Sequence, residues 1–170
     1  MRSSCAPYKD CKRQKQKGGD IDAKLYTAAR KGNVDAVKNM LDEGADVNKT
    51  HNLWGDTPLH IASQKGDVNV VRVLLEQGAD IDKATNGGTT SLHIASAMGH
   101  VEVVRMLLEQ RADIEKATNR GATPLYVASE KGHVDVVRVL MEQGADINKA
   151  NNNGTTPLNV ASEKGHVEVV

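Results

Sequence analysis

Six histidines are the residues of this 170-residue chain best suited to chemistry, because imidazole binds metals and transfers protons near neutral pH. Three of them, His100, His133 and His166, recur at intervals of 33 residues. This regular interval predicts one histidine in each of several stacked units, about one helix spacing of roughly 8–10 Å apart. Zinc needs its nitrogen ligands within about 2.1 Å of the metal. We therefore interpret these histidines as structural and predict no metal site.

Other residue groups also lack the spacing that catalysis requires. The glutamate–lysine pairs at 130–131 and 163–164 are adjacent, and adjacent helical residues do not face each other. Gly87–Gly88 lacks the lysine and the strand–loop–helix setting of a phosphate-binding loop. No serine or cysteine has a plausible base partner. We therefore predict that the chain is not an enzyme and uses no cofactor.

A 33-residue repeat dominates the sequence. Thr-Pro-Leu-His or a close variant of it recurs four times in register, at 57–60, 90–93, 123–126 and 156–159. Residues 123–137 and 156–170 are identical at 13 of 15 positions. Each unit has the pattern of a helix, a turn, a second helix and a loop. Since neither helix can bury its apolar stripe alone, the units must stack to form one continuous core.

The unit that begins near residue 88 illustrates the expected elements. Thr90 is predicted to cap the first helix through its hydroxyl group, and Gly99 is predicted to end it. The second helix is predicted to run from near Val101 to near Gln110. Its buried face is predicted to carry Val101, Val104, Leu107 and Leu108. The prolines expected at the first helical position of the other units are Pro58, Pro124 and Pro157.

The position after each second helix favours a left-handed backbone, which suits Gly44, Gly78 and Gly144. Arg111 occupies the equivalent position in the third unit. A non-glycine residue in this conformation costs roughly 1–2 kcal/mol. The sequence therefore predicts local backbone strain at Arg111.

The 33-residue interval, the Thr-Pro-Leu-His-x-Ala motif and the Gly-His and Gly-Ala-Asp motifs resemble the ankyrin repeat family over residues 20–170. The resemblance implies an all-α solenoid. It also implies that His60 and His93 bond to the backbone of the adjacent unit, a motif from which Tyr126 and Asn159 depart. The five expected repeats are approximately 20–51, 52–84, 85–117, 118–150 and 151–170, the last of them incomplete. The first lacks the Thr-Pro motif and has a polar first helix, as a terminal unit requires.

The two ends of the chain differ from the repeats. Residues 1–19 hold six basic residues and one acidic residue, and we predict a disordered basic tail. The remainder holds 16 basic and 21 acidic residues, which argues against nucleic-acid binding. Val170 falls within an expected second helix, so we expect further units or another domain to follow. Residues 156–170 alone are expected to fray and to expose apolar surface.

The predicted setting is the cytoplasm or the nucleus, because no secretory signal is visible and both cysteines lie in the basic tail. The longest apolar runs are far shorter than a membrane span. We expect a monomer that does not insert into membranes.

The resemblance implies a scaffold or adaptor that binds a partner protein through a concave face of hairpin tips and first helices. The alternative is an N-terminal regulatory or targeting segment of an enzyme, channel or ubiquitin ligase whose effector domain lies beyond residue 170. Trp54 is either an interface anchor or packed against the first unit. Asn148 resembles a position that an asparaginyl hydroxylase modifies in some ankyrin proteins. The predicted partner-binding residues are Leu53, Trp54, Asp56, Gln64, Lys65, Asn86, Thr89, Met98, Asn119, Arg120, Glu130, Lys131, Asn152 and Asn153.

Overall fold

The computed structural model describes residues 21–170, in which every regular element is a helix. Residues 21–30 form the first helix. The later helices are α2 (Val34–Asp42), α3 (Pro58–Lys65), α4 (Val68–Glu76), α5 (Ser91–Met98), α6 (Val101–Glu109), α7 (Pro124–Lys131), α8 (Val134–Glu142) and α9 (Pro157–Lys164). The predicted all-α solenoid is confirmed. The predicted basic tail at 1–19 lies outside the described residues.

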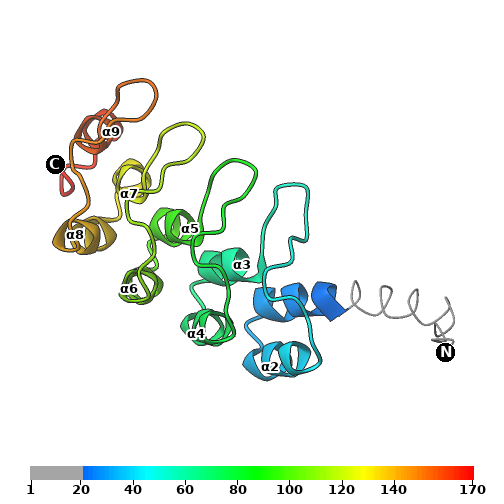
Figure 1. Ribbon diagram of the computed structural model, residues 1–170. Coiled ribbons are helices and arrows are strands. Elements are labelled where there is room, and N and C mark those ends of the chain that lie inside the picture. Colours follow the sequence, from blue (N-terminus) through cyan, green and yellow to red (C-terminus); the bar gives the residue numbers. More distant parts are fainter. Residues whose placement is uncertain (1–20) are drawn as a thin grey trace, which may run out of the picture.

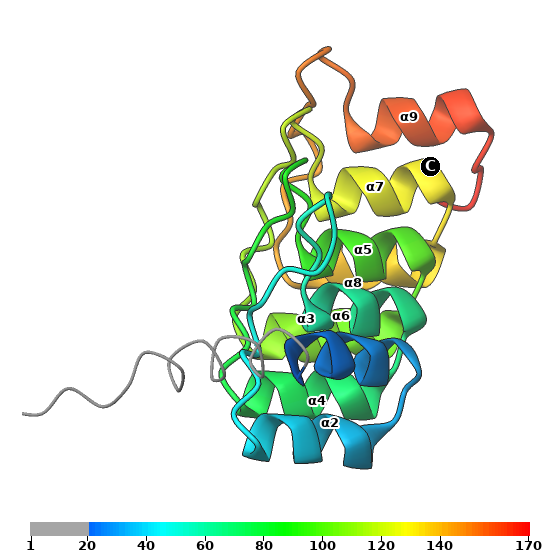
Figure 2. The ribbon, with the colours of Figure 1, turned by 90° about the vertical axis from the view of Figure 1, so that its right-hand side faces the viewer.

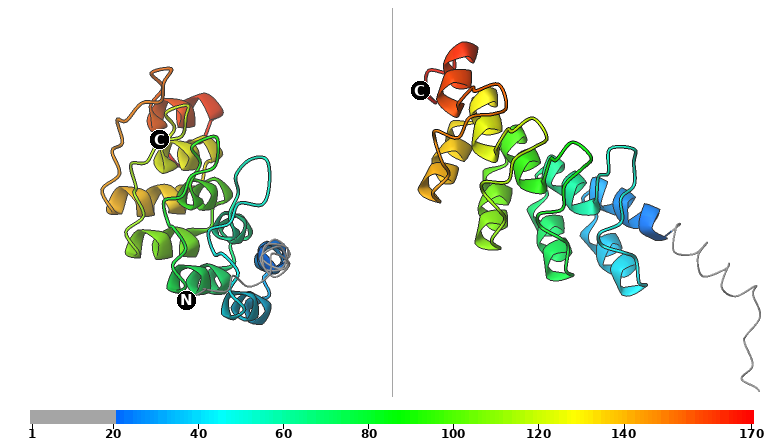
Figure 3. Two further views of the ribbon diagram at one scale, coloured as in Figure 1. Left: turned by 45° about the vertical axis from the view of Figure 1, so that its right-hand side comes forward. Right: turned by 45° about the horizontal axis from the view of Figure 1, so that its top comes forward.

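The helices form two parallel rows (Figure 1). One row holds residues 21–30 and then the first helix of each later unit, α3, α5, α7 and α9, whereas α2, α4, α6 and α8 form the other row. Helices contact their neighbours within a row and their partner within a unit. Figure 2 shows that the loops between units all project on one side of this stack. The oblique views of Figure 3 show the same two rows and regular succession.

The repeated threonine starts each first helix by accepting a backbone hydrogen bond. Thr90 accepts one from the backbone nitrogen of His93, and the His93 ring in turn accepts one from the backbone nitrogen of Thr90. Thr57 and His60 form the same reciprocal pair in α3. Proline occupies the start of α3, α7 and α9, where its missing N–H costs nothing. The predicted helix starts are confirmed.

The core is a single ladder of small and medium aliphatic side chains that runs through the whole stack. The four repeat leucines illustrate it, because Leu59, Leu92 and Leu125 are buried. The fourth, Leu158, is 52% exposed. Buried Ala62, Ala95, Ala128 and Ala161 allow neighbouring first helices to approach closely. Burial of these surfaces against the next unit is the main source of stability.

The buried face of α6 differs in part from the prediction. Val104 and Leu107 are buried as expected, but Val101 and Leu108 are only partly buried. Val103, which was not predicted, is 1% exposed. Because α6 lies in the middle of the stack, it contacts three helices: α4 of the preceding unit, α8 of the following unit and α5 of its own unit. Its buried surface is therefore wider than the single stripe that periodicity predicts.

Histidines tie successive units together. The Nε2 atoms of His100, His133 and His166 donate to backbone carbonyls of the preceding unit at 2.9–3.0 Å. The Nε2 atom of His93 donates in the other direction, to Ala122 O of the following unit, at 3.0 Å. The Nε2 atom of His60 donates at 3.0 Å to Lys83 O, which lies at the end of its own unit. The bond to the adjacent unit is therefore confirmed for His93, and the structural role of His100, His133 and His166 is confirmed as well. These side chains are engaged in holding neighbouring repeats in register.

Arg111 has a φ of +66°, the only positive φ of a non-glycine residue between 21 and 170. Its counterparts Gly44, Gly78 and Gly144 have φ values of +91°, +79° and +88°. The predicted left-handed conformation of Arg111 is therefore confirmed.

The final residues of the chain form α9 followed by a turn. α9 packs against α7. Leu158, Val167 and Val170 are 52%, 82% and 64% exposed, which confirms the expected apolar surface. Fraying of residues 156–170 stays a prediction.

Candidate functional site

The four loops between units are short hairpins, each closed by a backbone hydrogen bond. The first hairpin closes between His51 N and Asp56 O, and the others close between residues 85 and 89, 118 and 122, and 151 and 155. The first hairpin therefore contains one residue more than each of the other three. We use "concave face" for the exposed surface of these hairpins and of α3, α5, α7 and α9.

The largest cluster of predicted partner-binding residues surrounds a hollow of about 520 Å³ between the third and fourth hairpins. Its walls come from both hairpins and its floor includes residues of α7. Five of the predicted residues line it: Asn119, Arg120, Glu130, Asn152 and Asn153. The structure thus brings together side chains that are up to 34 positions apart in the sequence.

Tyr126 also lines this hollow and was not among the predicted partner-binding residues. It occupies the position at which α3 and α5 carry a buried histidine. The backbone nitrogen of Tyr126 still donates to Thr123 Oγ1, at 3.2 Å, but the ring is only partly buried. The departure from Thr-Pro-Leu-His was the signal that could have identified this site. The Tyr126 side chain is more exposed than the histidines at the same position of α3 and α5.

The Tyr126 hydroxyl is suited to hydrogen bonding in its neutral form. Burial raises the pKa of Tyr126, and the nearby carboxylates of Glu130 and Glu163 raise it further, while a hydrogen bond with Asn151 opposes them. At neutral pH the hydroxyl is therefore both a donor and an acceptor. The hollow combines this phenol with a cation, Arg120, and a carboxylate, Glu130.

Three of the predicted residues have a structural role in the hairpins. The side-chain nitrogens of Asn86, Asn119 and Asn152 each donate to a carbonyl of the preceding hairpin, at 2.8, 2.9 and 3.0 Å. The backbone nitrogens of the same asparagines also donate to that hairpin. These amides hold the hairpins side by side and leave only the remaining polar atoms of each side chain for a partner.

The remaining predicted residues lie elsewhere on the concave face. Leu53 and Trp54 are 93% and 74% exposed at the tip of the first hairpin, so Trp54 does not pack against the first unit. Asp56 and Thr89 are partly buried within hairpins. The exposed residues at the ends of the first helices are Gln64, Lys65, Met98 and Lys131.

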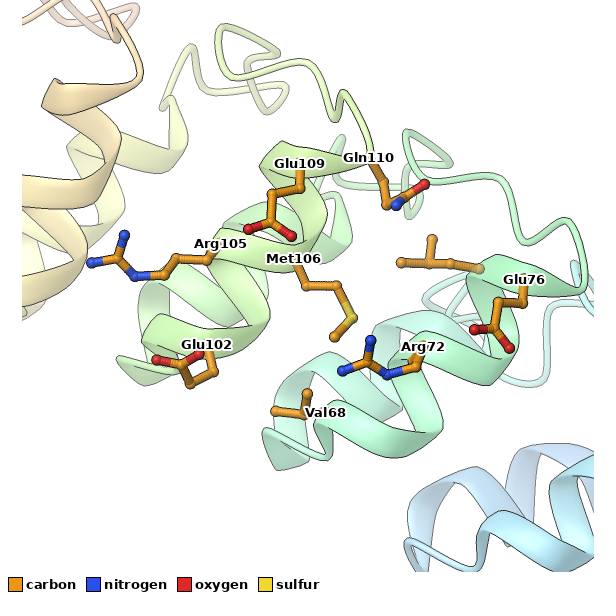
Figure 4. Close-up of a pocket in the computed structure, with 9 residues that line it drawn as sticks. Val68, Arg72, Glu76, Glu102, Arg105, Met106, Glu109 and Gln110 are labelled. Carbon is orange, nitrogen blue, oxygen red and sulfur yellow. The ribbon is translucent and has the colours of Figure 1, made fainter.

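A second hollow, of about 290 Å³, lies between α4 and α6 in the other row of helices. In Figure 4, long charged side chains of both signs surround Met106, among them Arg72, Arg105 and Glu109. Arginine and glutamate at these positions recur in register in α8, as Arg138 and Glu142. This recurrence indicates a solvated face common to the units. We therefore regard the hollow on the concave face as the better candidate for specific recognition.

Two properties of the described residues bear on other kinds of site. Between residues 21 and 170, no three histidine, cysteine, aspartate or glutamate residues are grouped so that they could hold a metal ion. No helix in this range has both the length and the apolar character needed to cross a membrane.

Comparison with known proteins agrees with the architecture. The family described as "Ankyrin repeats (3 copies)" matches residues 25–118 and 113–170. A search of curated proteins finds no match. Ankyrin repeats are in general protein–protein interaction modules. The matched segments cover most of the chain and coincide with the stacked helices, and the chain therefore belongs to the ankyrin repeat family.

Proposed function

We propose that the chain binds a partner protein through its concave face, with the hollow around Tyr126 as the centre of the contact. The observation that supports this most is the convergence of Arg120, Tyr126 and Glu130 on one hollow between two hairpins. None of these three residue types occurs at the matching position of the third unit, which carries Gly87, His93 and Ala97. Residues that differ between repeats are the ones that can distinguish one partner from another.

The chemistry of the hollow suits a polar segment of a protein. Arg120 can pair with a carboxylate and Glu130 with an ammonium or guanidinium group. Asparagine side chains and the Tyr126 hydroxyl can bond to peptide N–H and C=O groups. The hairpins that carry these groups are held together by the asparagine bonds, so little ordering is needed on binding.

A test compares two double variants in affinity capture followed by quantitative mass spectrometry. Arg120→Ala with Glu130→Ala alters the hollow, and Arg72→Ala with Glu109→Ala is the matched control on the α4–α6 face. We expect the first variant to lose partners that the wild-type chain and the control retain. Circular dichroism verifies that both variants are folded. If the control variant loses the partners and the concave variant retains them, the contact lies on the opposite face and the proposal is wrong.

A further inference from the structure

Asparagine is followed by glycine at two places in the chain, Asn86–Gly87 and Asn153–Gly154, and both pairs lie within hairpins. In this dipeptide the backbone nitrogen of glycine can attack the side-chain carbonyl carbon of asparagine, because glycine has no Cβ atom to hinder the close approach. The product is a five-membered succinimide ring, which water then opens to aspartate or isoaspartate. The chain therefore contains two candidate sites of spontaneous modification.

Hydrogen bonds to neighbouring hairpins protect Asn86 from this reaction. Its side-chain nitrogen, the group that must leave, donates to Leu53 O of the first hairpin at 2.8 Å. Its backbone nitrogen donates to Trp54 O at 2.9 Å, and its carbonyl accepts a bond from the side chain of Asn119 at 2.9 Å. Because the reaction releases the side-chain nitrogen as ammonia, it must break the bond to Leu53 O and disturb a residue that is held on both sides.

The side chain of Asn153 has no such restraint. It is exposed and forms no hydrogen bond with any residue between 21 and 170; only the backbone nitrogen of Asn153 is bonded, to Asn151 Oδ1 at 2.9 Å. A Cβ atom placed on Gly154 would meet nothing within 4 Å, so the ring can form in open space. The Gly154 nitrogen donates to Asn151 O at 2.9 Å, and this bond within the same turn is the one that must open before the attack.

We propose that Asn153 is a site of spontaneous deamidation and that the fold selects it over Asn86. The first step forms a bond between the Gly154 nitrogen and Asn153 Cγ and breaks the bond between Cγ and Nδ2. The proton of the Gly154 nitrogen leaves with Nδ2 as ammonia. Water that cleaves the new bond from Cγ to nitrogen yields aspartate. Water that cleaves the original peptide bond yields isoaspartate, in which the main chain passes through Cγ.

The conversion changes the hollow on the concave face. Asn153 lines this hollow together with Arg120 and Glu130. Either product adds a carboxylate at position 153, where a neutral amide stood. Isoaspartate also lengthens the main chain by one methylene group inside a hairpin that is closed between residues 151 and 155. Only the effect on a partner rests on the proposed function, whereas the modification itself does not.

The test follows both sites in the purified whole chain during incubation at mildly alkaline pH. Trypsin separates them, because Asn86 lies in the peptide 84–105 and Asn153 lies in the peptide 150–164. Mass spectrometry with electron-transfer fragmentation distinguishes asparagine, aspartate and isoaspartate at each position. We expect Asn153 to convert at least about tenfold faster than Asn86, the ratio that one or two net hydrogen bonds supply. A rate at Asn86 that equals or exceeds the rate at Asn153 overturns the proposal.

The same incubation in guanidinium chloride isolates the contribution of the fold. In the unfolded chain both sites are asparagine–glycine pairs without contacts to other hairpins, so their rates of conversion should converge. If the difference in rate persists in the denaturant, it arises from the neighbouring sequence rather than from the fold, and the proposal is wrong.

Enzymatic methylation of isoaspartate provides an independent measurement. After incubation, protein-isoaspartate methyltransferase with radiolabelled S-adenosylmethionine marks the isoaspartate in the folded chain. Asn153→Gln should remove most of the label, because glutamine cyclises far more slowly than asparagine, and the matched control Asn86→Gln should retain it. Circular dichroism before the incubation verifies that both variants are folded. Label that survives Asn153→Gln, or a wild-type chain that gains no label, overturns the proposal.

Discussion

Replacing Arg111 with glycine should stabilise the protein, and the effect can be estimated from the backbone. The φ of Arg111 is +66°, in the left-handed region that its counterparts fill with glycine. A side chain in this region costs roughly 1–2 kcal/mol. Glycine offsets part of the stabilisation, by about 0.5–1 kcal/mol, because it loses more conformational entropy than other residues when the chain folds. We expect Arg111→Gly to raise the free energy of unfolding by about 1 kcal/mol.

The surroundings of Arg111 indicate that relief of backbone strain accounts for most of the expected change in stability. A Cβ atom placed on the counterparts Gly44, Gly78 or Gly144 would meet nothing within 4 Å. The Arg111 side chain is exposed, and among residues 21–170 it forms no ion pair. Removing the side chain therefore relieves no clash and should break few contacts, and the change in stability comes from φ.

Thermal unfolding followed by circular dichroism measures this effect. For a domain of 150–250 residues, about 1 kcal/mol corresponds to a rise in Tm of roughly 2–4 °C. Arg111→Ala is the matched control, because it removes the guanidinium group but keeps the Cβ and its strain. The reverse change, Gly78→Arg, should lower stability by a similar amount. An unchanged Tm for Arg111→Gly, or an equal rise for Arg111→Ala, would refute the reasoning.

Two further predictions concern the histidines whose rings bond to backbone carbonyls. Burial lowers the pKa of His60 and His93, against weaker opposing contributions that include Asp56 for His60 and the Ala122 carbonyl for His93. In acid these two histidines therefore bind protons more readily in the unfolded chain than in the folded chain. The free energy of unfolding should be at its full value above about pH 6.5 and should decrease as the pH falls below it. Chemical denaturation at pH 7.5 and 5.5 measures this loss, and His60→Asn with His93→Asn should reduce the pH dependence while lowering stability at both values. Gly99→Ala should destabilise the chain more than Gly144→Ala, by about 1 kcal/mol. A Cβ atom at Gly99 would lie 2.8 Å from His133 Nδ1 and would disturb the bond from His133 to Ala97 O, whereas a Cβ atom at Gly144 would meet nothing within 4 Å. Equal losses of stability for the two variants in urea titrations would contradict a stabilising role for the bond from His133 to Ala97 O.

The membership of residues in repeats, and much of their local structure, was predictable from the sequence. The threonine caps, the prolines at helix starts and the left-handed positions all depend on residues within a few positions of each other. Their agreement with the structure, including the strained Arg111, follows from this local character. The incorrect part of the α6 prediction has the opposite cause, since Val103 is buried by neighbouring helices that periodicity does not describe.

The candidate site was predictable only in part. Alignment to the repeat placed Arg120 and Glu130 on the concave face, but it did not show that they share a hollow with Tyr126. Asn119 and Asn152 illustrate the same limit, because each bonds to a carbonyl 33 positions earlier in the chain. Contacts of this range depend on how the hairpins stack, which no local pattern specifies.

The sequence by itself determined the repeat, the ends of the helices and most of the residues that each unit buries against its neighbours. These features follow from short-range geometry and from the regular 33-residue interval. Only the tertiary structure decided whether Trp54 lies in the core or in water. Either arrangement satisfied the local pattern, and the direction of the hairpin relative to Tyr26 and Asn86 leaves the indole exposed. Packing across units selects among arrangements that are equally acceptable within one unit.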